Sequence, residues 1–327
     1  MEKTTIAGVE VSRVGLGTWA IGGSEWGAVA EDTAIATCLN AIERGINFID
    51  TAPIYGRGRA EEIIGKAMRA YGRRDAFYIA TKAGLDWNER GVFANSKPQR
   101  LRKEIEDSLR RLGTDCVDLY QIHWPDTRMP VAEVAGVLSN FQSEGKVRAL
   151  GVSNFSASQM EEFRRVTPLT SDQPPYNIFE REIDRETLPW CAGNGVGVLT
   201  YSSLCRSLLG GRVRRGMTFE AGDIRNVDPK FQEPRFSQYI TAVERLTELA
   251  YRYGKSVAQL AVRWVLDRPG VSVALWGAKR PDQLDAAGGV SGWKLDAQAM
   301  AEIDRIVADS VTDPVGPEYL TPMVREN

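Results

Sequence analysis

The stretch KPQRLRKEIEDSLRRLGTDCVDLYQIH, residues 97–123, contains a helix pattern followed directly by a strand pattern. Its first part repeats apolar side chains at intervals of three and four residues, which is typical of an amphipathic helix. These side chains are Leu101, Ile105, Leu109 and Leu112. The apolar run VDLYQIH has the length of a buried strand and closes on His123. Repetition of this helix–strand step along the chain would decide the fold.

The same alternation recurs along the whole sequence. Strand patterns occupy residues 11–18, 48–52, 77–82, 117–123, 147–154, 169–174, 197–203 and 271–277. Helix patterns occupy residues 31–44, 60–71, 97–112, 130–145, 157–165, 184–192, 236–253, 257–267, 281–287 and 296–310. Such alternation indicates a parallel α/β sheet, and eight units in 327 residues favour a single closed (β/α)8 TIM barrel. An open doubly wound sheet is the alternative.

The segments outside this alternation complete the expected fold. Residues before Val11 are expected to form an N-terminal hairpin that caps the bottom of the barrel. The polar stretch 209–233 exceeds the usual loop limit of about a dozen residues, which predicts a long functional βα loop. No linker or low-complexity segment interrupts the chain, so residues 1–327 are expected to form one domain.

The composition argues against several classes of function. The net charge is −2 with acids and bases mixed along the chain, which argues against a nucleic-acid or membrane partner. No apolar run approaches the roughly 20 residues that span a bilayer. The four cysteines are scattered, as expected for reduced thiols in a cytoplasmic protein. A single histidine argues against a zinc or other transition-metal site, so no metal is expected.

Polar residues close three successive strand patterns. Asp50 ends the second pattern and Tyr55 lies on the following loop, while Lys82 and His123 end the next two. Each residue alone has an ordinary explanation, as a turn carboxylate, a loop aromatic, a solvated cation or a structural histidine. In a (β/α)8 barrel, however, all four would meet on the catalytic rim.

These four side chains suit the protonation of an oxygen atom. A phenol has a pKa of about 10, and a neighbouring ammonium lowers it. Lys82 could supply that ammonium, held in place by Asp50 through a charge-assisted hydrogen bond. His123 could orient a carbonyl or relay a proton. A hydride delivered to the neighbouring carbon would have to come from a cofactor.

A phosphate site is expected where the last strand pattern ends, in WGAKRPDQL, residues 276–284. Lys279 and Arg280 precede Pro281, which suits the start of a helix and therefore an anion site. Two cations suit the 2′-phosphate of NADP, although a solvated basic loop is the simpler alternative. The Gly15-x-Gly17 motif is discounted as a dinucleotide fingerprint because IGGSEWG, with no helix pattern, follows it.

An ordered set of motifs spans essentially the whole chain: GLGTWA, FIDTAPIYGRGRAEEIIGKAM, IATK, RLGTDCVDLYQIHWPD, GKVRALGVSNF, QPPYNIFERE and SVALWGAKRPDQL. The set resembles the aldo-keto reductase superfamily. The wording of PPYNIFERE, YSSLCR and DPVGPEYLTP is most similar to the bacterial aldo-keto reductase 11 family, of the general stress protein type. The resemblance implies a (β/α)8 barrel that reduces small aldehydes and ketones to alcohols with NADPH, with NADH as a weaker cofactor. We expect a monomer.

The resemblance also implies roles for individual residues. The catalytic tetrad would be Asp50, Tyr55, Lys82 and His123, with Tyr55 as the general acid. The implied cofactor contacts are Thr18, Trp19, Asp50, Ser153, Asn154, Gln173, Tyr201, Ser202, Ser203, Leu204, Cys205, Arg206, Gly277, Ala278, Lys279, Arg280 and Gln283. Tyr176 is expected to stack on the nicotinamide, and Asp285 to lie near the adenosine. The implied substrate pocket comprises Trp19, Ile54, Trp87 and Trp124.

Three points remain open from the sequence. Many aldo-keto reductases have a Lys-Ser pair where this chain has Gly277-Ala278, so the manner of 2′-phosphate binding is undecided. A barrel aldolase that forms a Schiff base on Lys82 is an alternative enzyme class. A non-catalytic subunit that senses nicotinamide is an alternative of the binding class.

Overall fold

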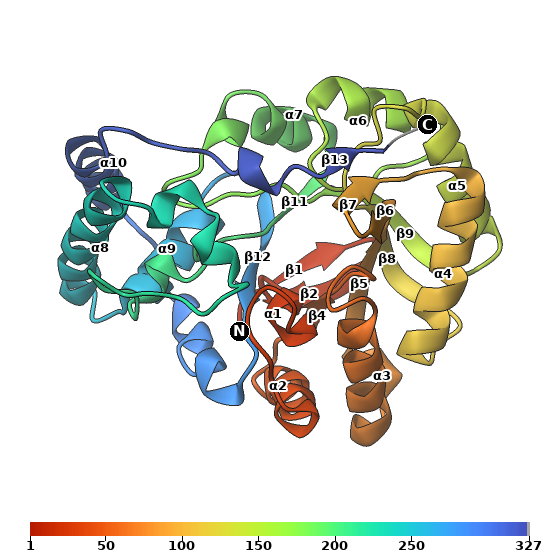
Figure 1. The fold of residues 1–327 in the computed structure, drawn as a ribbon, viewed down its shortest axis with the longest axis horizontal. Helices are drawn as coiled ribbons and strands as arrows, with labels where there is room; N and C mark the ends of the chain where they lie inside the picture. The colour runs from red at the N-terminus through yellow and green to blue at the C-terminus, as the bar shows by residue number, and fades with distance from the viewer. Residues whose placement is uncertain (326–327) are drawn as a thin grey trace.

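The computed structural model describes residues 1–325 and contains a closed parallel barrel in the order β10-β11-β12-β3-β4-β5-β8-β9 (Figure 1). Its strands are β3 (Val14–Gly17), β4 (Phe48–Asp50), β5 (Tyr78–Ala83), β8 (Val117–Ile122), β9 (Val147–Val152), β10 (Ser171–Asp172), β11 (Gly197–Thr200) and β12 (Val271–Gly277). The expected (β/α)8 barrel is therefore confirmed, and the open sheet is not formed.

Helices surround the barrel (Figure 1), except the single turn α1 (Trp19–Gly22), which follows β3 and lines the cavities described below. They are α1 (Trp19–Gly22), α2 (Glu31–Glu43), α3 (Arg59–Tyr71), α4 (Pro98–Leu112), α5 (Val131–Ser143), α6 (Ala157–Arg164), α7 (Thr187–Asn194), α8 (Arg235–Arg252), α9 (Val257–Leu266) and α10 (Ala297–Ser310). The helix expected at 281–287 is instead two short 3₁₀ turns, η6 (Pro281–Leu284) and η7 (Ala287–Val290). Gly288 and Gly289 lie within η7, and glycine disfavours a longer α-helix there.

An antiparallel hairpin closes the bottom of the barrel, as expected. Its strands are β1 (Lys3–Ile6) and β2 (Val9–Ser12), and Ile6 and Val11 join the apolar cluster of the barrel interior. The single strand expected at 11–18 is wrong, because its first two residues belong to the hairpin. The Ser12 hydroxyl donates to Val14 O at 2.7 Å and so shapes the bend before β3.

A small sheet lies at the opposite end of the barrel. The hairpin of β6 (Leu85–Asn88) and β7 (Gly91–Ala94) follows β5, and the C-terminal strand β13 (Met323–Val324) pairs with β7 in parallel (Figure 1). Arg325 anchors this strand, with Nη1 3.0 Å from Asn95 Oδ1. The C-terminal segment is therefore held beside the loops that follow β5 and β8.

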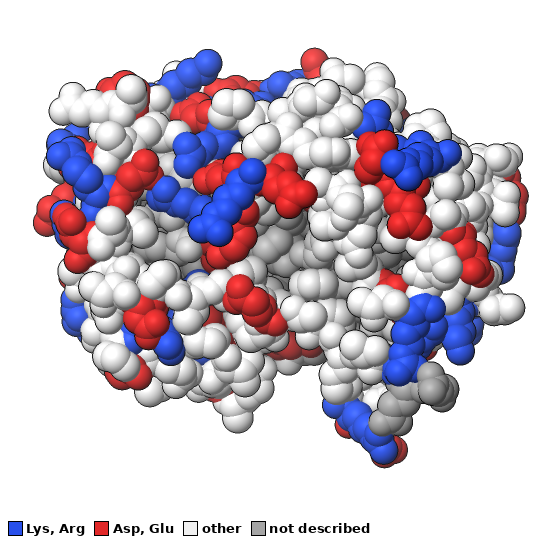
Figure 2. All heavy atoms as spheres, turned by 90° about the horizontal axis from the view of Figure 1, so that it is seen from above, with Lys and Arg blue, Asp and Glu red and all other residues white. Residues whose placement is uncertain are grey.

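The chain carries 41 lysines and arginines and 43 acids, a net charge of −2. Lysine and arginine are interspersed with acids on the face shown in Figure 2. None of the helices within residues 1–325 is long and apolar enough to cross a membrane.

Candidate active site

Asp50 and Lys82 form a buried pair at the C-terminal ends of neighbouring strands. Lys82 Nζ donates to the two carboxylate oxygens of Asp50 at 2.7 and 2.8 Å, and to Thr51 O at 3.0 Å. Burial raises the pKa of Asp50 and lowers the pKa of Lys82, while each partner acts in the opposite sense. The two short hydrogen bonds are the geometry of an ionised pair, because they satisfy both charges at once.

Tyr55 lies against this pair because two glycines bring its loop close to α1. A Cβ atom on Gly22 would lie 2.6 Å from the backbone nitrogen of Gly56, and Gly56 itself has a φ of +62°. Only glycine allows this approach. The contact stacks Trp19 on the Tyr55 ring at 6.2 Å and leaves the Tyr55 hydroxyl 3.2 Å from Lys82 Nζ.

The direction in which the pKa of Tyr55 is shifted differs from the sequence expectation. We expected the Lys82 ammonium to lower the pKa of Tyr55. In the structure, burial raises that pKa well above its usual value, and Asp50 raises it further. Lys82 does not lower the pKa of Tyr55, because the carboxylate of Asp50 already compensates the charge of the Lys82 ammonium. Tyr55 is therefore a neutral phenol, which can donate a proton.

His123 completes the group of four residues predicted from the strand ends. Its ring meets the Tyr55 ring edge to face at 5.8 Å. Burial, and then the charge of Lys82, hold the pKa of His123 well below its usual value. The imidazole is thus neutral near pH 7 and can donate one hydrogen bond to a ligand oxygen.

Two cavities meet at this group. One has a volume of about 370 Å³ and runs from Asp50 toward the η6 turn; we call it the nucleotide cavity. The other has a volume of about 400 Å³ and opens past His123; we call it the carbonyl cavity. Trp19, Tyr55 and Tyr201 line both cavities. A ligand in one cavity would therefore touch a ligand in the other beside the Tyr55 hydroxyl.

The lining of the nucleotide cavity suits an anionic ligand. Four basic residues line it, Arg206, Arg225, Lys279 and Arg280, and Asp50 is the one acid among its lining residues. The three arginines also pair with carboxylates outside the lining, so they would offer N–H donors to a ligand more than uncompensated charge. A Cβ atom built on Gly277 would have no neighbouring atom within 4 Å, so the backbone there faces open space. These features fit the pyrophosphate and phosphate groups of a dinucleotide.

A hydrogen-bond network links the remaining predicted rim residues. Gln173 Nε2 donates to Asp50 Oδ1 at 2.7 Å, and Ser153 Oγ donates to Gln173 O at 2.6 Å. Tyr201 donates to Asn154 Oδ1 at 3.0 Å. Ser153, Asn154, Gln173 and Tyr201 also line the carbonyl cavity. They thus lie together beside the junction of the two cavities.

The two predicted phosphate ligands have different surroundings. Lys279 Nζ donates to Trp26 O and, at 3.3 Å, to Gly27 O, so its ammonium ties two loops together. Arg280 pairs with Asp282 at 3.1 Å, and its side chain is 43% exposed. Arg280 is therefore the more accessible of the two cations for a phosphate.

Several predicted contacts lie outside both cavities. Tyr176 is fully buried behind β10, where its ring packs 5.2 Å from Trp264, so its expected stacking role is wrong. Trp87 lies outside the lining of the carbonyl cavity because its ring packs against Arg100 at 5.5 Å. Thr18 and Cys205 are buried without lining either cavity. Asp285 instead pairs with Arg44.

The other expected cavity residues are placed as follows. Ile54 and Trp124 line the carbonyl cavity. The nucleotide cavity also contains Ser202, Ser203, Leu204, Ala278 and Gln283.

The structure adds cavity residues that sequence reasoning missed. Trp26 and Arg225 line the nucleotide cavity, and the Arg225 guanidinium lies 5.6 Å from the Trp26 ring. Tyr319 and Leu320 line the carbonyl cavity from the C-terminal segment. Trp26 lies in a turn, and the other three lie in three-residue 3₁₀ turns, η4 (Ile224–Asn226) and η8 (Glu318–Leu320), which are too short for a periodicity to indicate direction. The length of the 209–233 loop was the one signal that pointed toward Arg225.

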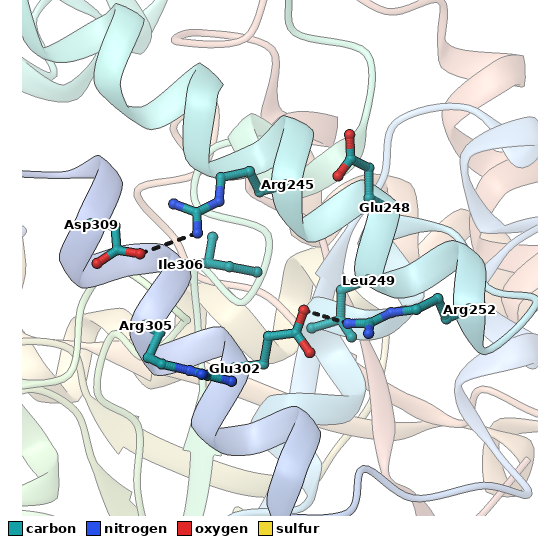
Figure 3. A pocket seen from close by; sticks show the side chains of 8 residues that line it. All are labelled: Arg245, Glu248, Leu249, Arg252, Glu302, Arg305, Ile306 and Asp309. Carbon is teal, nitrogen blue, oxygen red and sulfur yellow. Dashed lines mark hydrogen bonds and ion pairs between the residues drawn. The ribbon is translucent and has the colours of Figure 1, made fainter.

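A separate groove lies on the surface between α8 and α10 (Figure 3). Its volume is about 650 Å³, and charges of both signs line it. Arg245 pairs with Asp309 at 3.2 Å, and Arg252 pairs with Glu302 across the groove. None of these residues lines the nucleotide or the carbonyl cavity, so the groove is distinct from the candidate active site.

The comparison with known proteins agrees with this geometry. A sequence model of the "Aldo/keto reductase family" matches residues 13–308. The chain belongs to the aldo/keto reductase family. It is 51% identical to "Aldo-keto reductase YhdN" of Bacillus subtilis (strain 168), over 100% of this chain and 99% of the relative. Family membership makes the chain an oxidoreductase.

Two solved structures extend the comparison. The glycerol dehydrogenase AKR11B4 from Gluconobacter oxydans is 46% identical, with a TM-score of 0.88 over 96% of this chain and 98% of that chain. An aldo/keto reductase from Klebsiella pneumoniae in complex with NADP and acetate is 27% identical, with a TM-score of 0.73 over 96% of this chain and 99% of that chain. The resemblance to the family 11 reductases is thereby confirmed.

Proposed function

We propose that the protein reduces small aldehydes and ketones to alcohols with NADPH, and that Tyr55 is the proton donor. The observation that carries this proposal is the Tyr55 hydroxyl, which lies 3.2 Å from Lys82 Nζ on a ring that lines both cavities. When bound, NADPH supplies the hydride.

The residues of the tetrad divide the remaining work. Tyr55, neutral because its pKa is raised by burial and by Asp50, gives its proton to the carbonyl oxygen. Lys82 donates a hydrogen bond to the Tyr55 oxygen and so stabilises the negative charge that the transfer leaves there. Neutral His123 donates a hydrogen bond that orients the carbonyl. Asp50 keeps Lys82 charged and in place.

Residues of the nucleotide cavity would hold the cofactor. The basic lining suits the pyrophosphate, and Arg280 suits the 2′-phosphate because its guanidinium is accessible. Ser153, Asn154 and Gln173 would hold the carboxamide. Tyr201, which lines both cavities, takes the place that we expected for Tyr176. The NADP complex of the Klebsiella pneumoniae relative supports this choice of cofactor.

Small polyols and their oxidation products are the first substrates to test. The Gluconobacter oxydans relative is a glycerol dehydrogenase, and the oxidation of glycerol gives glyceraldehyde or dihydroxyacetone. We expect NADPH absorbance to fall when the protein is mixed with DL-glyceraldehyde, and more slowly with NADH. The absence of NADPH oxidation across a panel of aldehydes, ketones and sugars would contradict the proposal and favour the nicotinamide-sensing alternative.

The aldolase alternative has less support. An amine that forms a Schiff base must first lose a proton, yet Lys82 Nζ is bound by oxygen atoms of Asp50, Thr51 and Tyr55. Borohydride trapping of a carbonyl compound on Lys82 in the absence of nicotinamide would favour it nonetheless.

A further inference from the structure

Two cations and two acids form a cluster buried beside both cavities. We call Arg206, Lys230, Glu180 and Asp228 the buried ion cluster; each is at most 4% exposed. Arg206 Nε donates to Asp228 at 2.8 Å, and Arg206 Nη1 donates to Glu180 at 3.1 Å. Lys230 Nζ lies 2.8 Å from Glu180. The charges balance, so a change at one member would leave a buried charge without its partner.

One side of the cluster holds a strained turn of the nucleotide cavity. Cys205, Arg206 and Ser207 have φ values of +46°, +51° and +72°. Consecutive non-glycine residues in this left-handed region are disfavoured, and they persist only where surrounding contacts hold them. Arg206 supplies those contacts, because it also donates to Ser202 Oγ at 3.0 Å. Ser202, Arg206 and Ser207 all line the nucleotide cavity.

The other side of the cluster holds a wall of the carbonyl cavity. The Tyr319 hydroxyl donates to Asp228 Oδ2 at 3.0 Å, and the Tyr319 ring lies 5.6 Å from the Arg206 guanidinium. Lys230 Nζ donates to Gly316 O at 3.0 Å. Tyr319 lines the carbonyl cavity and does not line the nucleotide cavity. Asp228 thus joins the turn of one cavity to a wall of the other.

We propose that Tyr319 is a specificity-determining residue for the carbonyl substrate, and that the buried ion cluster positions it according to the occupancy of the nucleotide cavity. This inference rests on the proposed function. A ligand that fixes the turn at Arg206 also fixes Asp228 and hence Tyr319. Because such coupling is reciprocal, NADPH and the carbonyl substrate each increase the affinity of the protein for the other.

Tyr319→Phe tests the link because it keeps the ring and removes the hydrogen bond to Asp228. Tyr253→Phe is the matched control, since the Tyr253 hydroxyl also donates to an aspartate, Asp296, at 3.1 Å but outside both cavities. For Tyr319→Phe we expect the KM for DL-glyceraldehyde to rise about tenfold, the loss of one hydrogen bond to a charged acceptor. The value of kcat should change by less than about twofold, because Tyr319 does not touch the tetrad.

Hydrogen exchange gives a readout that does not depend on turnover. In the wild type and in Tyr253→Phe, NADPH should slow amide exchange in the segment 316–324. In Tyr319→Phe, NADPH should leave that exchange unchanged although fluorescence shows that it binds. Equal protection in all three proteins, or an unchanged KM in Tyr319→Phe, would overturn the inference. If the wild type binds NADPH but reduces no carbonyl compound, the proposed function fails, while the exchange experiment still decides the coupling.

Discussion

Replacement of Tyr55 by phenylalanine separates proton donation from every other property of the site. The ring remains, so its stacking on Trp19 at 6.2 Å remains possible. Lys82 loses one partner but keeps Asp50 and Thr51 O, so the buried ion pair is preserved. The variant should therefore fold, lose about 1 kcal/mol of stability from one hydrogen bond, and bind NADPH with unchanged affinity.

The loss in catalysis should be far larger. A positioned general acid typically contributes a factor of about 10² to 10⁴, and His123 would still offer a hydrogen bond to the carbonyl oxygen. We expect kcat/KM for DL-glyceraldehyde to fall about a thousandfold, which corresponds to about 4 kcal/mol of transition-state stabilisation.

The assay combines NADPH absorbance for turnover with NADPH fluorescence for binding. Tyr253→Phe, which alters a tyrosine outside both cavities, should behave as the wild type. A kcat/KM for Tyr55→Phe within about tenfold of the wild type, at unchanged NADPH affinity, would refute the assignment of Tyr55 as proton donor.

Three further predictions concern pH and cofactor choice. Burial and Asp50 raise the pKa of Tyr55, and burial lowers the pKa of His123, so kcat/KM for carbonyl reduction should show no inflection between about pH 6 and pH 9. The rate of alcohol oxidation should instead increase as pH rises. An inflection of kcat/KM for carbonyl reduction near about pH 6.5 would contradict this prediction. Arg280→Ala should lower the affinity for NADPH about tenfold and leave the affinity for NADH nearly unchanged. Lys279→Ala removes the hydrogen bond between Lys279 and Trp26 O that links two loops, so it should lower the affinity for NADH as well. Equal losses of affinity for both cofactors in Arg280→Ala would exclude a phosphate-binding role for Arg280. Burial raises the pKa of Glu104 to about 7, so the protonated side chain contributes stability that is fully present below about pH 4.5. As pH rises through about 7, the free energy of unfolding should fall by about 3 kcal/mol. Denaturant unfolding of Glu104→Gln should not show this fall, and an equal fall in the variant would contradict the assignment to Glu104.

Sequence reasoning located Asp50, Lys82 and His123 because each lies at or beside a strand end, and Tyr55 because it follows Asp50 on the next loop. Asp50, Lys82 and His123 close apolar runs of recognisable length, and parallel strands must bring such residues to one rim. It failed for Tyr176, which follows the two-residue strand β10 in an irregular segment. There the chain direction is set by hydrogen bonds such as Tyr176 N to Tyr201 O, 3.1 Å long, between residues far apart in sequence.

The same limit explains the pKa of Tyr55 and the missed cavity residues. The spacing of the strand ends indicated that Lys82 lies near Tyr55. How far Asp50 compensates the Lys82 charge depends on the distances from Lys82 Nζ to the two Asp50 carboxylate oxygens, 2.7 and 2.8 Å. Arg225 and Tyr319 reach the cavities from single 3₁₀ turns within long connections, where side-chain direction depends on tertiary contacts. The sequence therefore predicted the fold and the meeting of the four predicted side chains on one rim, while the full cavity walls required the structure.

The backbone contact between Gly22 and Gly56 determines where substrate range can be altered. This contact fixes Trp19 and Tyr55 as one unit, so enlarging the cavity at Trp19 would also disturb Tyr55, the proposed proton donor. Ile54, Trp124 and Leu320 line the carbonyl cavity without joining that stack. Libraries for directed evolution toward bulkier ketones should therefore vary these three positions and leave the two glycines and Trp19 unchanged.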